Sequence, residues 1–231
     1  MDEAASRLRF VVVQCGSLPL RPDRRWAPGV AHRCTATLVW PEGEPVTPDN
    51  SVIVDPCFDG PGWAEALTRL GSVGAGPLDI GRYHVSHWHG DHALRAPVDA
   101  AGGWRPIPDG GLEGVRLEPC PGHHRSLLAL VFAGAAGEVW VVGDAILDEE
   151  WLLAWECYWP NGYGPDEIVQ TWRSVARIVG SASIVVPGHG PPITVTRSLL
   201  GDLLRGLSEQ PLAAECPDVA ETLQAALARR G

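Results

Sequence analysis

Short motifs of histidine and aspartate, each following a strand-like run, constrain the fold of this chain more than any other feature. The first motif, HWHGDH, places three histidines and one aspartate within residues 87–92. The other motifs lie in the segments LEPCPGH, WVVGD and VVPGHG. They complete a set of seven candidate side chains: His87, His89, Asp91, His92, His123, Asp144 and His189. A loop at the end of a strand can hold a side chain rigidly at one edge of a sheet. We therefore expect a fold in which several strand ends meet and these side chains converge.

The residue types in these motifs indicate a metal site. Imidazole and carboxylate groups together bind first-row divalent metals such as zinc, manganese, iron and cobalt. Two imidazoles at alternate positions of an extended segment, as at His87 and His89, project to the same side. Gly122 and Gly188 precede the later histidines, and glycine allows a sharp turn that points the next imidazole back over the sheet edge. Five of the eight histidines lie in these motifs, so a polar loop that is rich in histidine by chance is the weaker interpretation.

The rest of the chain alternates between strand and helix patterns. Short runs rich in valine and threonine, bounded by proline, glycine and aspartate, predict strands over 9–15, 33–40, 51–56, 83–86, 114–120, 126–133, 138–144 and 183–187. Helical spacing of apolar residues predicts helices over 62–71, 165–180, 196–209 and 217–230. The pattern predicts the α/β class, with two sheets packed face to face and helices outside, as a four-layer αββα sandwich. We expect one domain over residues 1–231, with the C-terminal helices of 197–230 packed on it.

Charge and composition argue against several kinds of partner. The 231 residues carry a net charge of −10, and all 18 basic residues are arginine. A chain this acidic lacks the basic surface that nucleic acids and anionic membranes require. The apolar run over residues 10–13 is too short for a signal peptide, and no window approaches twenty apolar residues. With six cysteines and no CxxC pair, we expect reduced thiols and a cytoplasmic protein.

Together the motifs resemble the signature of the metallo-β-lactamase superfamily. The resemblance covers roughly residues 33–193 and implies an αββα sandwich with a two-metal site at one edge of the sheets. It implies two ligand sets with one bridging residue between them: His87, His89 and His123 for the first metal, Asp91, His92 and His189 for the second, and Asp144 as the bridge.

Two aspartates refine this resemblance. Asp55, in VIVDP, matches an early strand-end aspartate of the family that orients the ligands from outside the ligand set. The family usually continues with a small residue and glycine, whereas Pro56 and Cys57 stand here. Antibiotic-degrading members replace the bridging aspartate, so Asp144 argues against β-lactam hydrolysis. Thioester, lactone and phosphodiester hydrolases keep it.

These observations predict a dinuclear metal-dependent hydrolase. The expected cofactors are two divalent metal ions, zinc in the first place, with manganese or iron as alternatives. Two such ions can share a hydroxide whose pKa falls to roughly 7, and this hydroxide attacks a carbonyl carbon or phosphorus. Asp91 is placed to orient the nucleophile, and we predict Asp91 and Asp144 as the catalytic residues. The expected substrate is a small ester, thioester, lactone or phosphoester.

An aromatic stretch between Asp144 and residue 165 suggests the wall of a substrate pocket. Tyr158, Trp159 and Tyr163 lie in a segment rich in proline and glycine and could line an apolar pocket over the metals. This composition predicts a substrate with an apolar part. Trp151 and Trp155 have the spacing of one helix face, and we predict that both are in the core.

Several other side chains near the motifs have weaker signals. His124 follows a ligand and could donate a proton to a leaving group. Adjacent residues of an extended chain face apart, so a place at the surface or outside the ligand set is the other interpretation of His124. Trp88 is expected to pack beneath the metal loop. No function is assigned to His32 or His84.

Two alternative functions remain open. A metal-dependent RNA nuclease is one, because VVPGHGPP and the compact chain are similar to small members of the superfamily that process RNA, although the acidic charge opposes a polyanion. A mononuclear iron persulfide dioxygenase is the other. It would use only the three-histidine side, and the complete second ligand set argues against it.

Overall fold

Two five-stranded sheets form the centre of the molecule in the computed structural model, which describes residues 7–97, 102–107, 111–156 and 163–230. The first sheet has the order β1-β2-β3-β4-β5, with β1 at Leu8–Gln14, β2 at Ala36–Pro41, β3 at Val52–Val54, β4 at Arg82–His84 and β5 at Arg105–Pro106. The second sheet has the order β10-β9-β8-β7-β6, with β6 at Val115–Pro119, β7 at Leu128–Gly134, β8 at Gly137–Gly143, β9 at Ile184–Pro187 and β10 at Ile193–Thr194. Within the first sheet β1, β2 and β3 are antiparallel, whereas β4 and β5 join in parallel.

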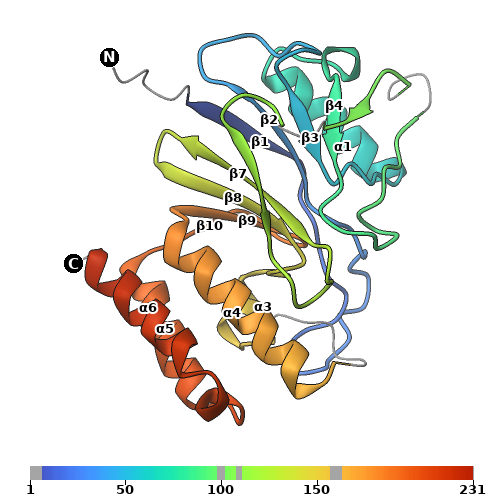
Figure 1. Ribbon diagram of the computed structural model, residues 1–231. Helices are drawn as coiled ribbons and strands as arrows, with labels where there is room; N and C mark the ends of the chain where they lie inside the picture. Colours follow the sequence, from blue (N-terminus) through green and yellow to red (C-terminus); the bar gives the residue numbers. More distant parts are fainter. Residues whose placement is uncertain (1–6, 98–101, 108–110, 157–162, 231) are drawn as a thin grey trace, which may run out of the picture.

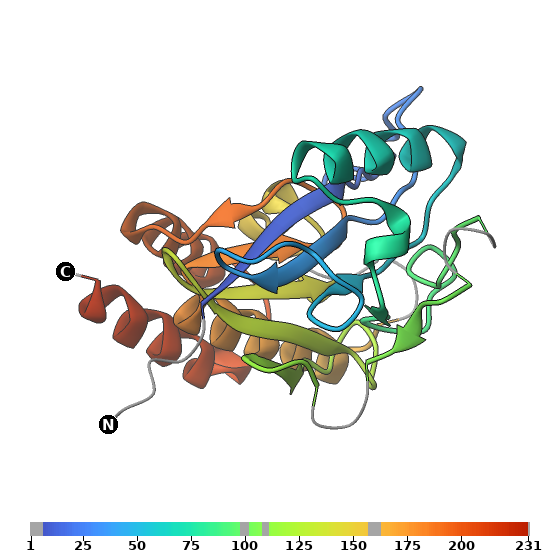
Figure 2. The same cartoon turned by 90° about the horizontal axis from the view of Figure 1, so that it is seen from above.

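Helices cover the outer face of each sheet. Helix α1 (Gly60–Ser72) lies on the first sheet, and α4 (Pro165–Ser181), α5 (Arg197–Ser208) and α6 (Pro217–Arg229) lie on the second (Figure 1). In the view from above, α1 and the group α4 to α6 stand on opposite sides of the strands (Figure 2). The four-layer αββα arrangement predicted from the sequence is thereby confirmed.

Alternating side chains of the strands build the separate layers of the core. On β8, Val139 and Val141 face the other sheet, whereas Trp140 and Val142 face the helices. This alternation follows from the strand geometry, in which successive side chains point to opposite faces. Each buried strand therefore contributes to two apolar layers at once.

Short elements escaped the sequence prediction. Strands β5 and β10 have two residues each, which is too short for a periodic signal. The helix α3 (Glu149–Leu153) occupies part of the aromatic stretch, and the side chain of Asp148 caps it by accepting from Trp151 N at 2.8 Å. None of the helices in the described parts of the chain is both long enough and apolar enough to cross a membrane.

Candidate metal centre

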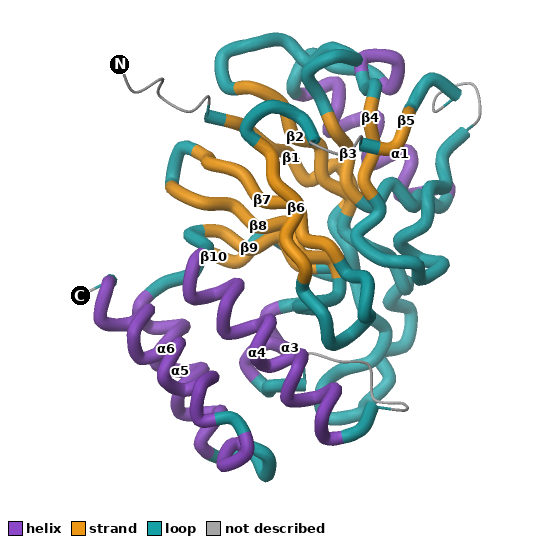
Figure 3. The backbone as a smooth tube through the Cα atoms, in the orientation of Figure 1, coloured by secondary structure: helices purple, strands orange, loops and turns teal. Residues whose placement is uncertain are grey.

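The loops that follow β4, β6, β8 and β9 carry the motif residues to one end of the two sheets (Figure 3). All seven candidate side chains come together there. They form two groups whose ligating atoms lie within 4.8 Å of one another: His87, His89, His123 and Asp144 in the first group, and Asp91, His92, Asp144 and His189 in the second. Asp144 is the residue that the two groups share.

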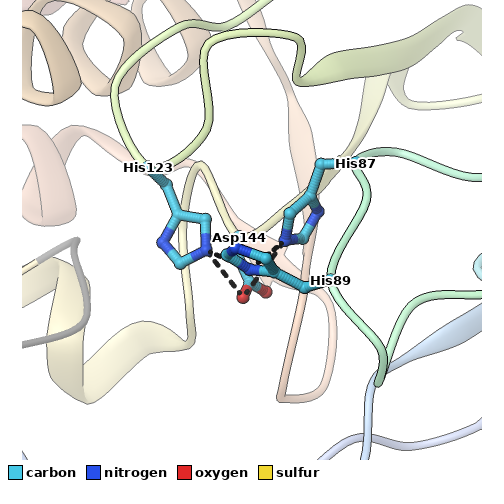
Figure 4. A group of neighbouring side chains, drawn as sticks. All are labelled: His87, His89, His123 and Asp144. Carbon is cyan, nitrogen blue, oxygen red and sulfur yellow. Dashed lines mark hydrogen bonds and ion pairs between the residues drawn. The ribbon is translucent and has the colours of Figure 1, made fainter.

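In the first group, three imidazole rings point toward the carboxylate of Asp144 (Figure 4). His89 Nδ1 lies 3.0 Å from His87 Nε2 and 3.1 Å from His123 Nε2. Asp144 Oδ2 lies 3.3 Å from His123 Nε2 and 3.7 Å from His87 Nε2. Two nitrogens bound to one tetrahedral zinc ion would be about 3.3 Å apart, because each Zn–N bond is about 2.0–2.1 Å long. The spacing of these nitrogens therefore fits a shared cation.

The second group is built around the other oxygen of the same carboxylate. Asp144 Oδ1 lies 3.0 Å from His92 Nε2 and 3.1 Å from His189 Nε2, and Asp91 Oδ2 lies 3.6 Å from His189 Nε2. Among the described residues, neither His92 Nε2 nor Asp144 Oδ1 has a partner with hydrogen-bond geometry, although both atoms are buried. Leaving buried polar atoms unpaired is unfavourable. A cation at this point would satisfy both atoms, so the donor set fits a second ion.

Hydrogen bonds to the outer ring nitrogens orient two histidines of the second group. His92 Nδ1 lies 2.9 Å from Asp55 Oδ2, and His189 Nδ1 lies 2.7 Å from the backbone carbonyl oxygen of Arg33. Carboxylate and carbonyl oxygens only accept, so Nδ1 donates in both rings. Each Nε2 then keeps its lone pair for a cation.

Asp55 and Ser86 connect the two groups. The backbone N–H of Ser86 donates to Asp55 Oδ1 and its hydroxyl donates to Asp55 Oδ2, both at 2.7 Å. Because that hydroxyl donates to Asp55, its oxygen accepts from His87 Nδ1 at 3.1 Å, which leaves His87 Nε2 available. Asp55 has a φ of +48°, a left-handed conformation that aspartate adopts more readily than most residues. This Asp–Ser pair thus orients one histidine of each group.

The loop that carries His189 is held by the first sheet. Thr35, just before β2, donates its backbone N–H to Gly188 O at 2.6 Å, and its hydroxyl donates to Gly190 O at 3.0 Å. A Cβ on Gly188 would lie 2.1 Å from Asp144 Oδ1. Gly188 lies in the turn that follows β9, as predicted, and its lack of a Cβ makes room for the shared carboxylate. Gly122 has a φ of +141°, which favours glycine.

Burial keeps two histidines of the first group neutral. It lowers the pKa of His87 to about 3 and that of His123 to about 4, and this effect outweighs the opposing attraction of Asp144. Metals bind the neutral imidazole. A cation in this group therefore displaces no proton from either ring near neutral pH.

The second group has the opposite charge state. Burial by itself lowers the pKa of His92, but the carboxylates of Asp144 and Asp55 outweigh it and raise that pKa well above its usual value. Asp144 likewise raises the pKa of His189 against the effect of burial. Burial would raise the pKa of Asp144, yet His92, His189 and His123 hold it well below the usual range. Without metal, the second group thus holds protons that a cation would replace.

A pocket of about 320 Å³ opens over both groups. The residues that line it are His32, His89, Asp91, His123, Asp144, Tyr163 and His189. Tyr163 thus lies at the site, where its hydroxyl donates to His123 O at 2.8 Å. Tyr158 and Trp159, the other two predicted pocket residues, lie outside the described residues.

The tryptophans divide between core and surface. Trp151 and Trp155 are 1% and 0% exposed, which confirms the prediction that they are core residues. The prediction for Trp88 is wrong, because its side chain is 79% exposed. His87 and His89 both turn toward Asp144, and the side chain between them is directed to solvent.

His124 lies beside the metal groups. Its ring centroid is 5.5 Å from that of His89, and its Nδ1 is 2.9 Å from Ser126 Oγ. The ring also borders a second hollow of about 580 Å³, which shares Tyr163 with the pocket over the metal groups. A role in proton donation stays a prediction.

Sequence reasoning missed three side chains at the centre, namely His32, Ser86 and Thr35. Adjacency to His87 was the one available signal for Ser86. His32 and Thr35 lie far from the motifs along the chain and reach the centre through the pairing of strands in the first sheet and the packing of the two sheets. His84, which was assigned no function, contacts Leu128 O through Nε2 at 2.8 Å and so connects the two sheets.

Comparison with known proteins places this geometry in context. No model of a known protein family matches the chain. The chain is 33% identical over 160 residues to metallo-beta-lactamase domain-containing protein 1 of Homo sapiens, which is 60% of this chain and 58% of the human protein. It is 25% identical over 153 residues to the Xenopus laevis protein of that name, which is 57% of this chain and 63% of that protein. The chain thus spans less than two thirds of the length of the curated relatives it matches.

The fold has counterparts among solved structures. A Thermotoga maritima protein assigned to the metallo-beta-lactamases superposes with a TM-score of 0.54 at 19% identity, covering 81% of this chain and 99% of that one. The chain has the metallo-β-lactamase fold. This fold agrees with the resemblance of the motifs and with the αββα layers. A structural likeness at this identity concerns the fold, so activity has to be argued from the site.

Proposed function

We propose that this protein is a dinuclear metal-dependent hydrolase that cleaves an ester, thioester, lactone or phosphoester of a small molecule. The observation that carries the proposal is the pair of histidine and aspartate groups that share Asp144 at the floor of one pocket. When bound, two divalent cations would lower the pKa of a water to supply a nucleophile and would place positive charge beside the developing oxyanion. Zinc is the first expectation, with manganese or iron as alternatives.

The protein's own residues form two cation sites at the centre. The first cation would be held by His87, His89 and His123, and the second by Asp91, His92 and His189, with Asp144 between them. The side chain of Asp91 is 28% exposed and lines the pocket, a position from which its carboxylate can orient a nucleophilic water. Asp55 and Ser86 keep the rings in place.

The walls of the pocket support a small substrate with an apolar part. Tyr163 contributes an aromatic face at the pocket. The net charge of −10 disfavours a polyanionic nucleic acid as the substrate.

A chelator-controlled screen tests the proposal. Purified protein is loaded with zinc or manganese and assayed on nitrophenyl esters, acyl-thioesters, lactones and bis-nitrophenyl phosphate, with Asp144→Ala as the blank. We expect turnover of at least one class, lost on chelation, restored by metal and absent in the variant. Metal analysis should give two ions per chain.

Other outcomes would replace this proposal. Cleavage of single-stranded RNA without turnover of any small substrate would make the protein a nuclease. Oxygen consumption with a persulfide and one iron per chain would make it a dioxygenase.

A further inference from the structure

His32 is a histidine at the metal centre that lies outside both ligand groups. It lies on the loop before β2 and lines the pocket over the metal groups. Its Nε2 is 3.1 Å from Asp91 Oδ2, and its ring centroid is 5.1 Å from that of His189. The ligand groups found among the described residues do not include it. His32 would therefore act on a cation through the ligands it contacts, of which Asp91 lies within hydrogen-bond distance.

Asp91 depends on a contact with a neighbouring donor more than Asp144 does, which is the other acidic ligand. The side chain of Asp144 is 6% exposed and lies among four histidines, whereas the side chain of Asp91 is 28% exposed. Asp91 Oδ2 is still 3.6 Å from His189 Nε2 and 3.8 Å from His92 Nε2. A carboxylate at the open side of the pocket can rotate away from these rings unless a donor holds it.

The segment that carries His32 is itself anchored. Arg33 O accepts from His189 Nδ1 at 2.7 Å, and Arg33 and Ser17 exchange backbone hydrogen bonds of 3.0 and 2.9 Å. The Arg33 side chain extends away from the pocket to Asp59 Oδ2, at 2.7 Å. Two consecutive residues thus contact two ligands of the second group, one through a backbone carbonyl and the other through an imidazole.

We propose that His32 is a positioning residue of the second cation site, which donates from Nε2 to Asp91 Oδ2 and holds that carboxylate toward His92 and His189. This inference rests on the proposed two-cation function. It assigns His32 to the affinity and selectivity of one site, while the first site is independent of it. An outer contact of this kind typically changes metal affinity by about 10–100-fold.

The test is a zinc titration of the metal-free full chain by calorimetry, with a competing chelator. For wild type we expect two ions bound at two separable affinities. For His32→Ala we expect one of them to weaken by about 10–100-fold and the other to stay unchanged. His32→Gln keeps an N–H donor and should recover part of the loss. Cobalt substitution gives a second readout, because the absorption bands of the second equivalent should change in His32→Ala.

Control variants distinguish a positioning role of the His32 side chain from a general loosening of the loop that carries it. Ser17→Ala removes the hydroxyl contact with Ala31 O, which is 2.6 Å long and anchors the residue before His32, and keeps the imidazole of His32, so we expect wild-type affinities at both sites. The His32 side chain is 44% exposed, and exposed pairs contribute little to folding, so the melting temperature of metal-free His32→Ala should equal that of wild type. Asp91→Ala should weaken the same site, and the double variant should be no weaker than Asp91→Ala alone.

Each outcome has a distinct meaning. Wild-type affinities in His32→Ala, or equal weakening of both sites, would overturn the role of His32 while leaving the two-cation function intact. A matching loss in Ser17→Ala would assign the effect to the loop and overturn the proposal. Wild type that binds a single ion would overturn the two-cation function and this inference with it.

Discussion

His87 and His123 approach Asp144 from one side, and His92 and His189 approach it from the other, yet these imidazoles hold protons differently. Burial dominates on the first side and keeps the rings neutral. On the second side, the carboxylate of Asp144 outweighs burial and favours the charged rings. The carboxylate of Asp144 thus lies between two groups of histidines with different protonation states. Asp55 contributes to this difference because it adds a second negative charge beside His92.

This difference predicts how metal affinity depends on pH. A cation at the second group must displace protons from His92 and His189, whose pKa values are raised, so its affinity should fall as pH decreases, by up to tenfold per unit for each proton displaced. His87 and His123 have lowered pKa values of about 3 and about 4, so these rings do not compete for protons above pH 4. We expect the second site to show the steeper pH dependence.

The measurement is calorimetry of zinc binding between pH 5.5 and 8 (a range that spans the usual histidine pKa of about 6.5) in buffers of different ionisation enthalpy. Proton release should accompany the second ion more than the first. Equal release at both sites would contradict the charge assignment.

A second prediction at this scale concerns Asp55. Asp55→Asn keeps a residue that tolerates the left-handed backbone, but it replaces one of the two carboxylate oxygens that contact Ser86 and His92. We expect metal affinity to fall by about 10–100-fold with a near-native circular dichroism spectrum. Ser86→Ala removes the contacts to Asp55 Oδ2 and His87 and should act in the same direction. Unchanged affinity in both variants would mean that the rings do not need this support.

Among the elements, the ends of β6 and β9 depend on glycine for two different reasons. After β6, Gly122 has a positive φ, and a Cβ there would lie 2.5 Å from the Cα of Thr171 in α4. After β9, the Cβ of residue 188 would instead meet the carboxylate of Asp144. The first glycine lets a helix approach the His123 loop, and the second lets a loop approach the shared ligand.

Replacing these two glycines with alanine should affect the stability of the fold and the two metal sites differently. Gly122→Ala should destabilise the fold by about 1–3 kcal/mol, because the backbone is strained and α4 must shift. It should weaken chiefly the first site through His123. Gly188→Ala should weaken both sites, because it displaces Asp144.

Gly90→Ala is the matched control within the metal loop, since an added Cβ there meets no atom within 4 Å. Urea unfolding and zinc titration measure the effects. A Gly90→Ala variant as damaged as the other two would refute the steric explanation.

Over the whole molecule, the centre joins the two sheets. The motif over 87–92 follows β4 of the first sheet, whereas His123, Asp144 and His189 follow strands of the second. The inner faces of both sheets also share an apolar layer that includes Val39, Val54, Leu130 and Val141. Metal bound at the centre would therefore add to the apolar packing and to the hydrogen bonds of Thr35 and His84 that already join the two sheets.

Removal of metal should lower the melting temperature. A ligand that binds only the folded state, and is present at 100 times its dissociation constant, stabilises that state by about 2.7 kcal/mol. In a chain of this size this corresponds to a rise in melting temperature of about 5–10 °C. Differential scanning calorimetry before and after dipicolinate treatment measures the shift. Asp144→Ala should lose most of the dependence on added metal. Equal melting temperatures with and without metal would contradict the bridging role of the centre.

Much of the architecture could be predicted from local pattern. The strands that became β7, β8 and β9 and the helix α4 have strong period-two or helical signals, and their predicted bounds are within two residues of those observed. Strands β5 and β10 could not be predicted, since pairing with a neighbour and not their own two residues defines them. The position of Trp88 was predicted wrongly because burial in a loop depends on the direction of the flanking ligands.

The sequence by itself determined the chemistry of the centre: the histidines and aspartates, their spacing, and the strands that precede them are all local properties of the chain. Only the tertiary structure decided that His32 reaches Asp91, that the carbonyl of Arg33 orients His189, and that Gly188 makes room for Asp144. The contact of His32 joins two loops of the first sheet, that of Gly188 joins two loops of the second, and that of Arg33 joins loops from both sheets. Their existence depends on how the strands pair and the sheets pack, and no local pattern of residues encodes these distances.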